Sequence, residues 1–505
     1  MIASQTIDGK PRRPNRALVG FGGRPVLWLL TAGVMTLALV FGGGGTGQGL
    51  WADAVIQLSS LALLGFLIPI TLREGTAGAS RPALLLIAAS VLLPLYQLLP
   101  LPPSLWSVLP ERSEVVTAYR QAGIDLPWLP ISLDPAATWR RLLSLLPPIA
   151  IVFATLRLSH RARRTLSLLI VAFGVVSVLL GFAQFMQGPD SPLRFFPISS
   201  RDSSVGFFAN RNHYAALLYS VVPLAAAWMI GLSRDRRPER VFGLAVCLLV
   251  YVALVLGLGM ALSRTGILLA VMAVIGSLLM AAVHAPRTGR RGLAIIAGAA
   301  VIGAILVGQF AFFGLLKRFD EDALADYRFR ITEITLDAIR AYQPIGSGFG
   351  TFVPVYQTFE VPDALLPYYV NHAHNDWLEI MLEGGWPAAA ALLGFLAWFG
   401  RSLLRVWRAG PDDERTLDDA LARAASIVVV LILIHSMVEF PLRTTALMCL
   451  FAWCCALLLP PARSAQRVDS YRNGASRRPE RGQPRGFPVF RTKRGASTWQ
   501  SGRFR

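Results

Sequence analysis

Residues 241–284 read VFGLAVCLLVYVALVLGLGMALSRTGILLAVMAVIGSLLMAAVH, two apolar runs separated by a turn of about three residues that contains Arg264. Each run is close to the ~20 residues that a helix needs to cross a hydrocarbon core of roughly 30 Å. Because lipid offers no hydrogen-bond partners, the backbone of such a run must satisfy its own polar groups and is expected to be helical. This stretch therefore predicts two consecutive membrane-spanning helices.

Apolar runs of this kind recur along the whole chain. Of its 505 residues, 54% are hydrophobic and 16% are charged, whereas soluble domains carry about 25% charged residues. The runs are too long and unbroken for the strands of a membrane barrel. The sequence predicts an all-α, polytopic integral membrane protein of about 12 transmembrane helices. The predicted spans are 25–42, 51–72, 83–100, 141–157, 165–187, 213–232, 241–262, 266–284, 293–315, 376–400, 423–440 and 444–461.

The net charge of +19 is distributed as a topology signal and not as a nucleic-acid-binding face. Lys and Arg are concentrated in every second loop and at both ends of the chain, and residues 462–505 alone contribute +10. By the positive-inside rule, both termini are predicted to be cytoplasmic. The basic tail is expected to be disordered, either solvated or in contact with anionic lipid headgroups. We therefore expect membrane lipids as partners and no nucleic acid.

The same rule orients the loops and divides the chain. Two long loops are predicted to face outward, and the longer of them is expected to contain short helices. The predicted parts are a basic cytoplasmic N-terminus at 1–24, transmembrane helices 1–9 at 25–315 with a periplasmic loop at 101–140, a long periplasmic loop at 316–375, helices 10–12 at 376–461, and the tail at 462–505.

Unusual polar residues gather on the predicted outward side, and Arg264 is the first of them. It lies close to the bilayer and breaks the positive-inside pattern, and a charge there is costly unless it is paired or bound to something. Its guanidinium suits phosphate oxygens. An Arg that snorkels to lipid headgroups fits the spacing equally well.

The second group is the segment NHAHNDWLE, which closes the longer outer loop and opens the tenth predicted span. His372 and His374 are two residues apart, and an imidazole can take a proton from a hydroxyl near neutral pH. Asn375 or Asp376 could cap the helix and Glu379 could answer the cap, which leaves the two histidines unexplained. A metal site is a weaker alternative, because helical side chains two residues apart point away from a common centre.

Two further groups stand at the outer ends of predicted helices. Asn210, Asn212 and His213 lie at the start of the sixth span, where an Asn could simply cap the helix. His435 and Glu439 are four residues apart near the end of the eleventh span, so on a helix they face one way. They are expected to be either a buried pair or one wall of a site.

The last group is a loop, YRFR at 327–330, followed by an amphipathic stretch to Tyr342 and the run PIGSGFGTF at 344–352. Its glycines either let the backbone approach an anion or form a tight turn. All these groups share one side of the membrane, whereas independent structural features should be spread over both. We therefore predict one outward-facing site, with Arg for anion binding and His for proton transfer.

At these residues the sequence resembles the O-antigen ligase/polymerase superfamily of bacterial membrane glycan-assembly enzymes. The most specific match is His374-Asn375 followed by nine residues and Gly385, which is similar to the family's His-Asn-x9-Gly motif. Supporting matches are Ser263-Arg264, the Arg330 segment that leads into the Gly-rich run, the cluster at 210–213, and the segment EFPLR that ends at Arg443, which together span about residues 205–445.

The resemblance implies a GT-C-like glycosyltransferase of the bacterial inner membrane. Such an enzyme takes a glycan from an undecaprenyl diphosphate carrier on the periplasmic face and passes it to a hydroxyl of lipid A-core, of another glycan or of a protein. The family's reaction is metal-independent and inverting, so no metal and no cofactor are expected. These activities belong to lipopolysaccharide or exopolysaccharide biosynthesis, and the sequence does not separate an O-antigen ligase from a polymerase.

The resemblance also implies roles for single residues. His374 would be the base that activates the acceptor hydroxyl, and Arg264 and Arg330 would hold the diphosphate. Arg443 is a weaker candidate for the same role, and Glu439 stands where Asp is expected. The predicted substrate-binding residues are Arg330, Arg443, Asn210, Asn212, His213, His372, Asn375 and Glu439.

A transporter or flippase for polysaccharide or lipid-linked glycans, without transfer chemistry, is the alternative. Such proteins place ionisable residues near the midplane of broken helices. The predicted helix interiors here are almost free of charge, which favours the enzyme.

Overall fold

The computed structural model describes residues 24–44, 50–75, 81–196, 201–234, 239–288, 293–298, 301–302, 305, 323–362, 365, 370–409 and 416–461. The predicted N-terminal segment before Arg24, the predicted tail and most of the predicted ninth span lie outside these residues. The elements are α1 (Arg24–Phe41), α2 (Leu50–Glu74), α3 (Arg81–Gln97), β1 (Pro100–Leu101), α4 (Pro103–Trp106), α5 (Ser113–Gln121), β2 (Leu129–Pro130), α6 (Pro135–Ser144), α7 (Leu146–Arg157), α8 (His160–Gln187), α9 (Arg211–Arg234), α10 (Arg240–Met260), α11 (Arg264–Thr288), α13 (Ala323–Tyr342), α14 (Phe352–Phe359), α15 (Asp376–Arg408), α16 (Thr416–His435), the 3-10 helix η2 (Pro441–Arg443) and α17 (Thr445–Leu457).

The described residues are almost entirely helical, and their apolar helices are consistent with the polytopic membrane protein that the sequence predicts. Within the described ranges, seven helical segments are long and apolar enough to cross a membrane. They are Trp51–Arg73, Pro135–Arg157, His160–Gln187, Arg211–Ser233, Val241–Met260, Arg264–Ala285 and Asp376–Arg408. The helices α1, α3 and α17 are apolar but shorter. The number of about 12 spans, the GT-C-like arrangement and the orientation stay predictions.

Three of the boundaries that differ from the prediction bear on the site, each for a local reason. The loop predicted to reach residue 140 ends earlier, because Pro135 begins α6 and Asp134 caps it by accepting the N–H of Ala137 at 2.9 Å. The segment 327–330, predicted as a loop, lies inside α13. The helix predicted to run to residue 440 ends at His435, so Glu439 lies beyond α16.

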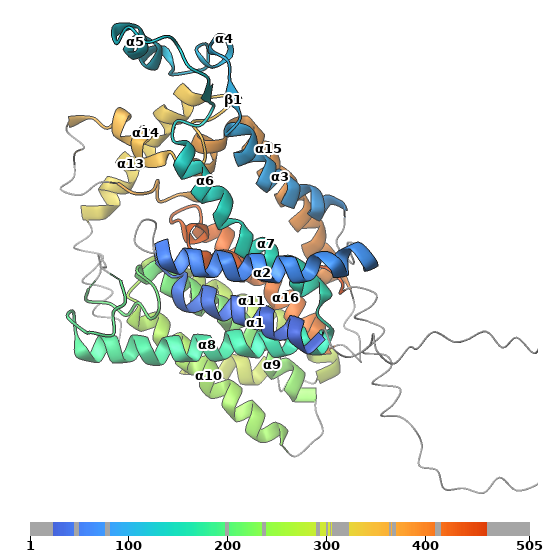
Figure 1. Ribbon diagram of the computed structural model, residues 1–505. Helices are drawn as coiled ribbons and strands as arrows, with labels where there is room; N and C mark the ends of the chain where they lie inside the picture. The colour runs from blue at the N-terminus through green and yellow to red at the C-terminus, as the bar shows by residue number, and fades with distance from the viewer. Residues whose placement is uncertain are drawn as a thin grey trace, which may run out of the picture.

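The helix α9 is the centre of the bundle. Its side chains from Tyr214 to Ile230 are almost all buried, and it packs against α10, α11 and α16. Figure 1 shows α1, α2 and α8 running alongside one another, while α4, α5, α13 and α14 lie together beyond them at the top of the view. The two predicted outer loops meet there, since the N–H of Leu133 donates to the carbonyl of Ser347 at 2.9 Å.

A break inside α15 joins the bundle to this outer region. Gly385 has φ 59° and ψ −155°, which interrupts the helix and leaves two carbonyls of the preceding turn without helical partners. The carbonyl of Leu382 accepts the N–H of Ser347 at 3.0 Å, and that of Glu383 accepts the N–H of Gly348 at 2.9 Å. The Gly-rich run is therefore a packing element that satisfies the broken helix.

This geometry explains the glycine of the His-Asn-x9-Gly pattern and predicts its replacement. In Gly385→Ala, the new Cβ would clash with the carbonyl oxygen of Pro344, at a positive φ that other residues rarely adopt. We expect the free energy of unfolding to fall by about 2 kcal/mol or more. Gly400→Ala, in open space on the same helix, should leave stability unchanged or raise it slightly. Equal melting temperatures for the two variants in detergent would contradict this role of the break.

Candidate active site

Glu439 is a fully buried carboxylate just beyond α16. Its Oε1 accepts hydrogen bonds from Arg328 Nη2 at 2.5 Å and from Asn212 Nδ2 at 2.6 Å, and lies 3.4 Å from His374 Nδ1. Burial alone would raise the pKa of this carboxyl, but the neighbouring His374 and Arg328 side chains hold it well below its usual range. We call Glu439, Asn212, Ser263, Arg328 and His374 the Glu439 cluster.

Arg264 is connected to this cluster through the turn that precedes it. Ser263 Oγ donates to Asn212 Oδ1 at 2.7 Å, and it also accepts the N–H of Gly266 at 3.0 Å, which caps α11. Arg264 is the first residue of α11 and is half-buried. Asn212 thus joins the start of α11 to Glu439, and Glu439 joins it to His374.

His374 combines partial exposure with a constrained backbone. Its side chain is 26% exposed, and its φ of 50° is unusual for a residue other than glycine. The next residue, Asn375, caps α15 by accepting the N–H groups of Trp377 and Leu378 at 3.0 and 3.1 Å. Because Nδ1 faces Glu439, Nε2 is the ring nitrogen left to take a proton from a ligand.

His372 does not meet solvent as His374 does. It is 2% exposed, and its Nδ1 lies 2.9 and 3.2 Å from the two carboxylate oxygens of Glu379. Burial lowers the pKa of His372, although the neighbouring Glu379 opposes this. Glu379 also accepts the N–H of Ala373 at 3.1 Å. Its carboxylate therefore fixes the loop before α15. The sequence predicts instead that Glu379 bonds to the residue that caps the helix, and the structure does not show this contact.

Three imidazoles surround the ring of Phe440. The centroid distances are 4.3 Å to His372, 5.0 Å to His213 and 5.1 Å to His374. His213 is buried at the start of α9. His435 makes no close pair with Glu439 and instead exchanges a hydrogen bond of 2.9 Å with the hydroxyl of Tyr219. Of the two readings of His435 and Glu439, a shared polar wall fits this geometry and a direct pair does not.

Arg443 belongs to a second group, the Arg443 cluster, with Asp376, Glu379 and Glu383. Its Nη1 lies 3.0 Å from Glu383 and 3.4 Å from Glu379, and its Nε lies 3.4 Å from Asp376. Burial would lower the pKa of Arg443, but the three carboxylates raise it. The charge that was predicted to hold a diphosphate is already balanced by protein groups.

Arg330 lies apart from both clusters. It is exposed on α13 and pairs with Glu333 at 2.7 Å. Arg328, two residues earlier, faces Glu439 in its place, because side chains two apart on a helix point in different directions. The sequence placed 327–330 in a loop and so gave no basis for choosing between the two arginines.

Asn210 and three helix starts complete the site. Asn210 lies directly before α9, and its Oδ1 accepts the N–H of Asn212 at 2.7 Å. The starts of α9, α11 and α15 thus meet around Asn212, Ser263 and His374. Helix N-termini carry partial positive charge and favour anions. Within the described ranges, no three His, Cys, Asp or Glu side chains are grouped so that they could hold a metal ion.

The sequence analysis gave no role to Arg328 or Glu383, and it interpreted Asp376 and Glu379 only as possible capping residues. Asp376, Glu379 and Glu383 are spaced three and four residues apart, which places them on one face of a predicted span. That spacing was a usable signal, since a charged face within a span is uncommon. The predicted helix interiors are almost free of charge, and the beginning of α15, with Asp376, Glu379 and Glu383, is an exception to that pattern.

Comparison with known proteins bears on the same residues. A family model described as O-antigen ligase matches residues 249–393, and no curated protein matches the chain. The matched region includes Ser263, Arg264, Arg328 and His374 and ends within α15.

A double-mutant cycle tests the Glu439 cluster. Arg328→Met should lower the free energy of unfolding by about 1–2 kcal/mol, a modest figure because Arg328 is 40% exposed. In a Glu439→Gln background the same change should have a smaller effect, because the buried charge is gone. The exposed pair of Asp337 and Arg340 on the same helix is the control, and its coupling should be close to zero. Equal coupling in the two pairs would contradict a buried, charge-dependent site.

Proposed function

We propose that this membrane protein is an inverting glycosyltransferase, and the match of residues 249–393 to the O-antigen ligase family model supports this proposal. It moves a glycan from an undecaprenyl diphosphate carrier to the hydroxyl of an acceptor, either lipid A-core or another glycan. The reaction takes place at the periplasmic face of the bacterial inner membrane. Both chain termini are cytoplasmic in this proposal.

The observation that carries the proposal is the arrangement of His374 against Glu439. A buried carboxylate 3.4 Å from Nδ1 orients the ring and stabilises its protonated form. His374 Nε2 takes the proton of the acceptor hydroxyl, and the hydroxyl oxygen attacks the anomeric carbon of the donor sugar. The bond from that carbon to the diphosphate oxygen breaks, and the diphosphate leaves with the electron pair.

Positive charge on the other side of the cluster stabilises the leaving group. Arg264 stands at the start of α11, and the starts of α9 and α15 lie beside it through Asn212 and His374. A guanidinium and oriented backbone N–H groups are the partners that a departing diphosphate requires. Arg443 is excluded from this role in the proposal, because its three carboxylates already balance its charge.

Translocation of a lipid-linked glycan without transfer is the second candidate, and one observation favours it. The helix α15 is broken at Gly385 and carries three carboxylates before the break, which is a pattern of transporter sites. These carboxylates are, however, occupied by Arg443, His372 and backbone N–H groups. His374 has no role in that alternative, so its replacement separates the two.

Replacement of His374 and Arg264 tests the enzyme directly. His374→Ala should lower kcat for glycan transfer from a lipid diphosphate about 10²–10⁴-fold, the usual contribution of a general base. Arg264→Ala should lower kcat/KM about 10²–10³-fold by removing charge stabilisation from the leaving group. The measurement is transfer by purified protein in proteoliposomes. Wild-type turnover in both variants would refute the catalytic proposal, and retained glycan translocation with no transfer in the wild type would favour the transporter.

Two arginines on α13 serve as controls for that assay. Arg340→Ala removes an exposed guanidinium paired with Asp337 and should leave transfer unchanged. Arg330→Ala should behave in the same way, since Arg330 is paired with Glu333 on the exposed face. A large loss in Arg330→Ala alone would show that the diphosphate reaches this face of α13, as the family resemblance implied.

A further inference from the structure

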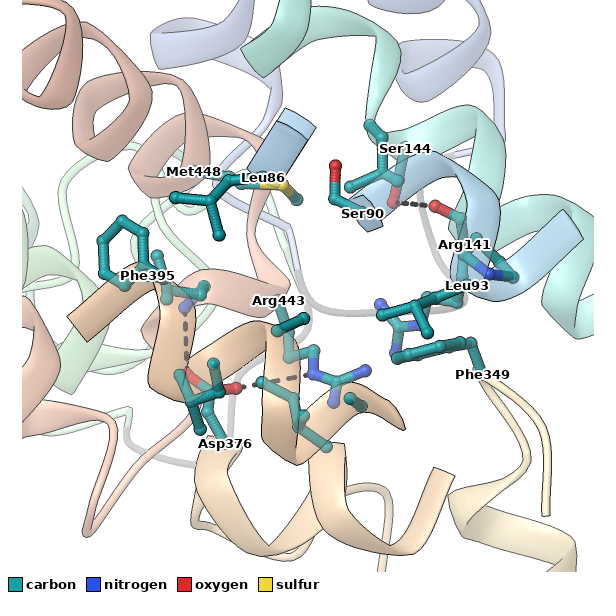
Figure 2. A pocket seen from close by; sticks show the side chains of 17 residues that line it. Leu86, Ser90, Leu93, Arg141, Ser144, Phe349, Asp376, Phe395, Arg443 and Met448 are labelled. Atoms are coloured by element: carbon teal, nitrogen blue, oxygen red, sulfur yellow. Dashed lines mark hydrogen bonds and ion pairs between the residues drawn. The ribbon is translucent and has the colours of Figure 1, made fainter. Parts of the chain in front are cut away.

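A cavity of about 320 Å³ lies between α3, α6 and α15, beside the Arg443 cluster. Most of its wall is apolar, and one end carries Arg141, Arg443 and Asp376. Figure 2 shows Arg443 joined to Asp376 by a dashed line, with Arg141 approaching from α6 and Phe395 among the apolar side chains that line the cavity. The cavity is therefore amphipathic, with hydrocarbon walls and a polar end.

The cavity is also long. Its lining residues on α15 run from Asp376 to Phe395, which is roughly five helical turns. Leu86 and Pro94 line it from α3. An elongated apolar space of this kind suits a hydrocarbon chain better than a sugar, whose hydroxyls would find few partners along the walls.

At the polar end of the cavity, the guanidinium of Arg141 has N–H donors that no described residue accepts. Its guanidinium makes no hydrogen bond or ion pair with any residue that the structure describes, although it is half-buried and carries five N–H donors. The hydroxyls of Ser90 and Ser144 already donate to backbone carbonyls at 2.7 Å. A half-buried, unpartnered guanidinium in an apolar wall is costly. The missing partner is a hydrogen-bond acceptor.

The carboxylates near Arg141 cannot fill that role, because they are engaged elsewhere. Asp376 accepts from the hydroxyl of Ser436 at 2.8 Å and lies 3.4 Å from Arg443. Glu383 accepts from a backbone N–H at 2.9 Å and from Arg443 at 3.0 Å. Asp53 is also in electrostatic range of Arg141, but it accepts a hydrogen bond from Thr445 at 3.5 Å and makes no ion pair with Arg141. The described residues thus leave the N–H groups of Arg141 open to an acceptor from outside the protein.

We propose that the cavity binds an acyl chain of an acylated membrane lipid, with the ester or amide carbonyl at the head of that chain accepting hydrogen bonds from Arg141. The carboxyl groups of Asp53, Asp376, Glu379 and Glu383 are in electrostatic range of Arg141, as is the guanidinium of Arg443. A carbonyl accepts hydrogen bonds from Arg141 without bringing a further negative charge next to these carboxyl groups, whereas a phosphate would bring one.

The assignment of this lipid as the acceptor rests on the proposed function, whereas the binding site itself does not. The cavity and His374 both adjoin the start of α15, because Asp376 lines the cavity and His374 lies two residues before it. A prenyl diphosphate has no carbonyl, so the acyl chain belongs to the acceptor. An acceptor with acyl chains is a lipid, and the enzyme is then a ligase and not a polymerase.

Photo-crosslinking tests the site without reference to catalysis. The full-length protein in nanodiscs is exposed to an N-acyl glucosamine with a diazirine in its chain, and the labelled peptides are identified by mass spectrometry. Labelling of α3 and α15 should fall roughly tenfold or more in Arg141→Met, the scale of one charge-assisted hydrogen bond. It should fall similarly in Ala391→Phe or the milder Ala391→Leu, which fill the cavity.

Neighbouring positions supply matched controls. Arg140 is exposed beside Arg141, and Ala390 is exposed beside Ala391, so Arg140→Met and Ala390→Phe should label as the wild type does. Equal labelling of Arg141→Met and wild type would mean that the probe enters the cavity as ordinary surrounding lipid does, without recognition by Arg141, and would overturn the proposal. Stronger protection by a prenyl diphosphate than by the unlabelled N-acyl glucosamine would also overturn it.

Transfer assays then separate this inference from the proposed function. Ala391→Leu should raise KM for an acylated acceptor and leave transfer to a soluble glycan acceptor unchanged. If the wild type transfers nothing but labels as expected, the proposed function fails and the lipid site stands. If transfer is normal with both acceptors in Ala391→Leu, the enzyme stands and the acceptor assignment fails.

Discussion

Glu439 is an ionised carboxylate with no exposed surface, and such a group is tolerated only when its surroundings supply charge and hydrogen bonds. Its partners come from three separate elements: Asn212 on α9, Arg328 on α13 and His374 in the loop before α15. Leaving the carboxylate uncompensated would cost several kcal/mol, so these elements must close around it together. The formation of the candidate site is thereby coupled to the packing of an outer helix against the bundle.

The start of α15 is held from both sides by this arrangement. Glu439 and Phe440 contact His374 in front of the helix, and behind it the break at Gly385 is filled by the Gly-rich run. The Arg443 cluster fixes the turn between them through three carboxylates on one helical face. The backbone strain at His374 is sustained because so many contacts determine its position. A histidine and a glycine eleven residues apart are thus held in place by one set of contacts around the beginning of α15, which explains the spacing of the His-Asn-x9-Gly pattern.

Local patterns in the sequence predicted what depends on local physics. The turn at Arg264, the cap at Asn375 and the helical character of the long apolar runs all follow from length, spacing and capping chemistry. The choice between Arg328 and Arg330 did not follow, because it depends on the phase of α13 and therefore on where that helix begins. The neutralisation of Arg443 was also hidden, since its partners lie about 60 residues away along the chain. Spacing alone could have revealed the charged face of α15. The position of Arg141 in the cavity wall could not be predicted in this way, because it depends on how α6 packs against α3 and α15.

Four of the six histidines lie around Glu439 and Phe440, and exposure distinguishes their roles. His213, His372 and His435 are at most 2% exposed, whereas His374 is 26% exposed. A ring sealed in protein can tune electrostatics and fill space, but it cannot meet an incoming hydroxyl. A ring exposed to a site and backed by a carboxylate can do so. Of the pair at 372 and 374, the first therefore belongs to the scaffold that holds Phe440, and the second is the group with both the access and the charge environment that proton transfer requires.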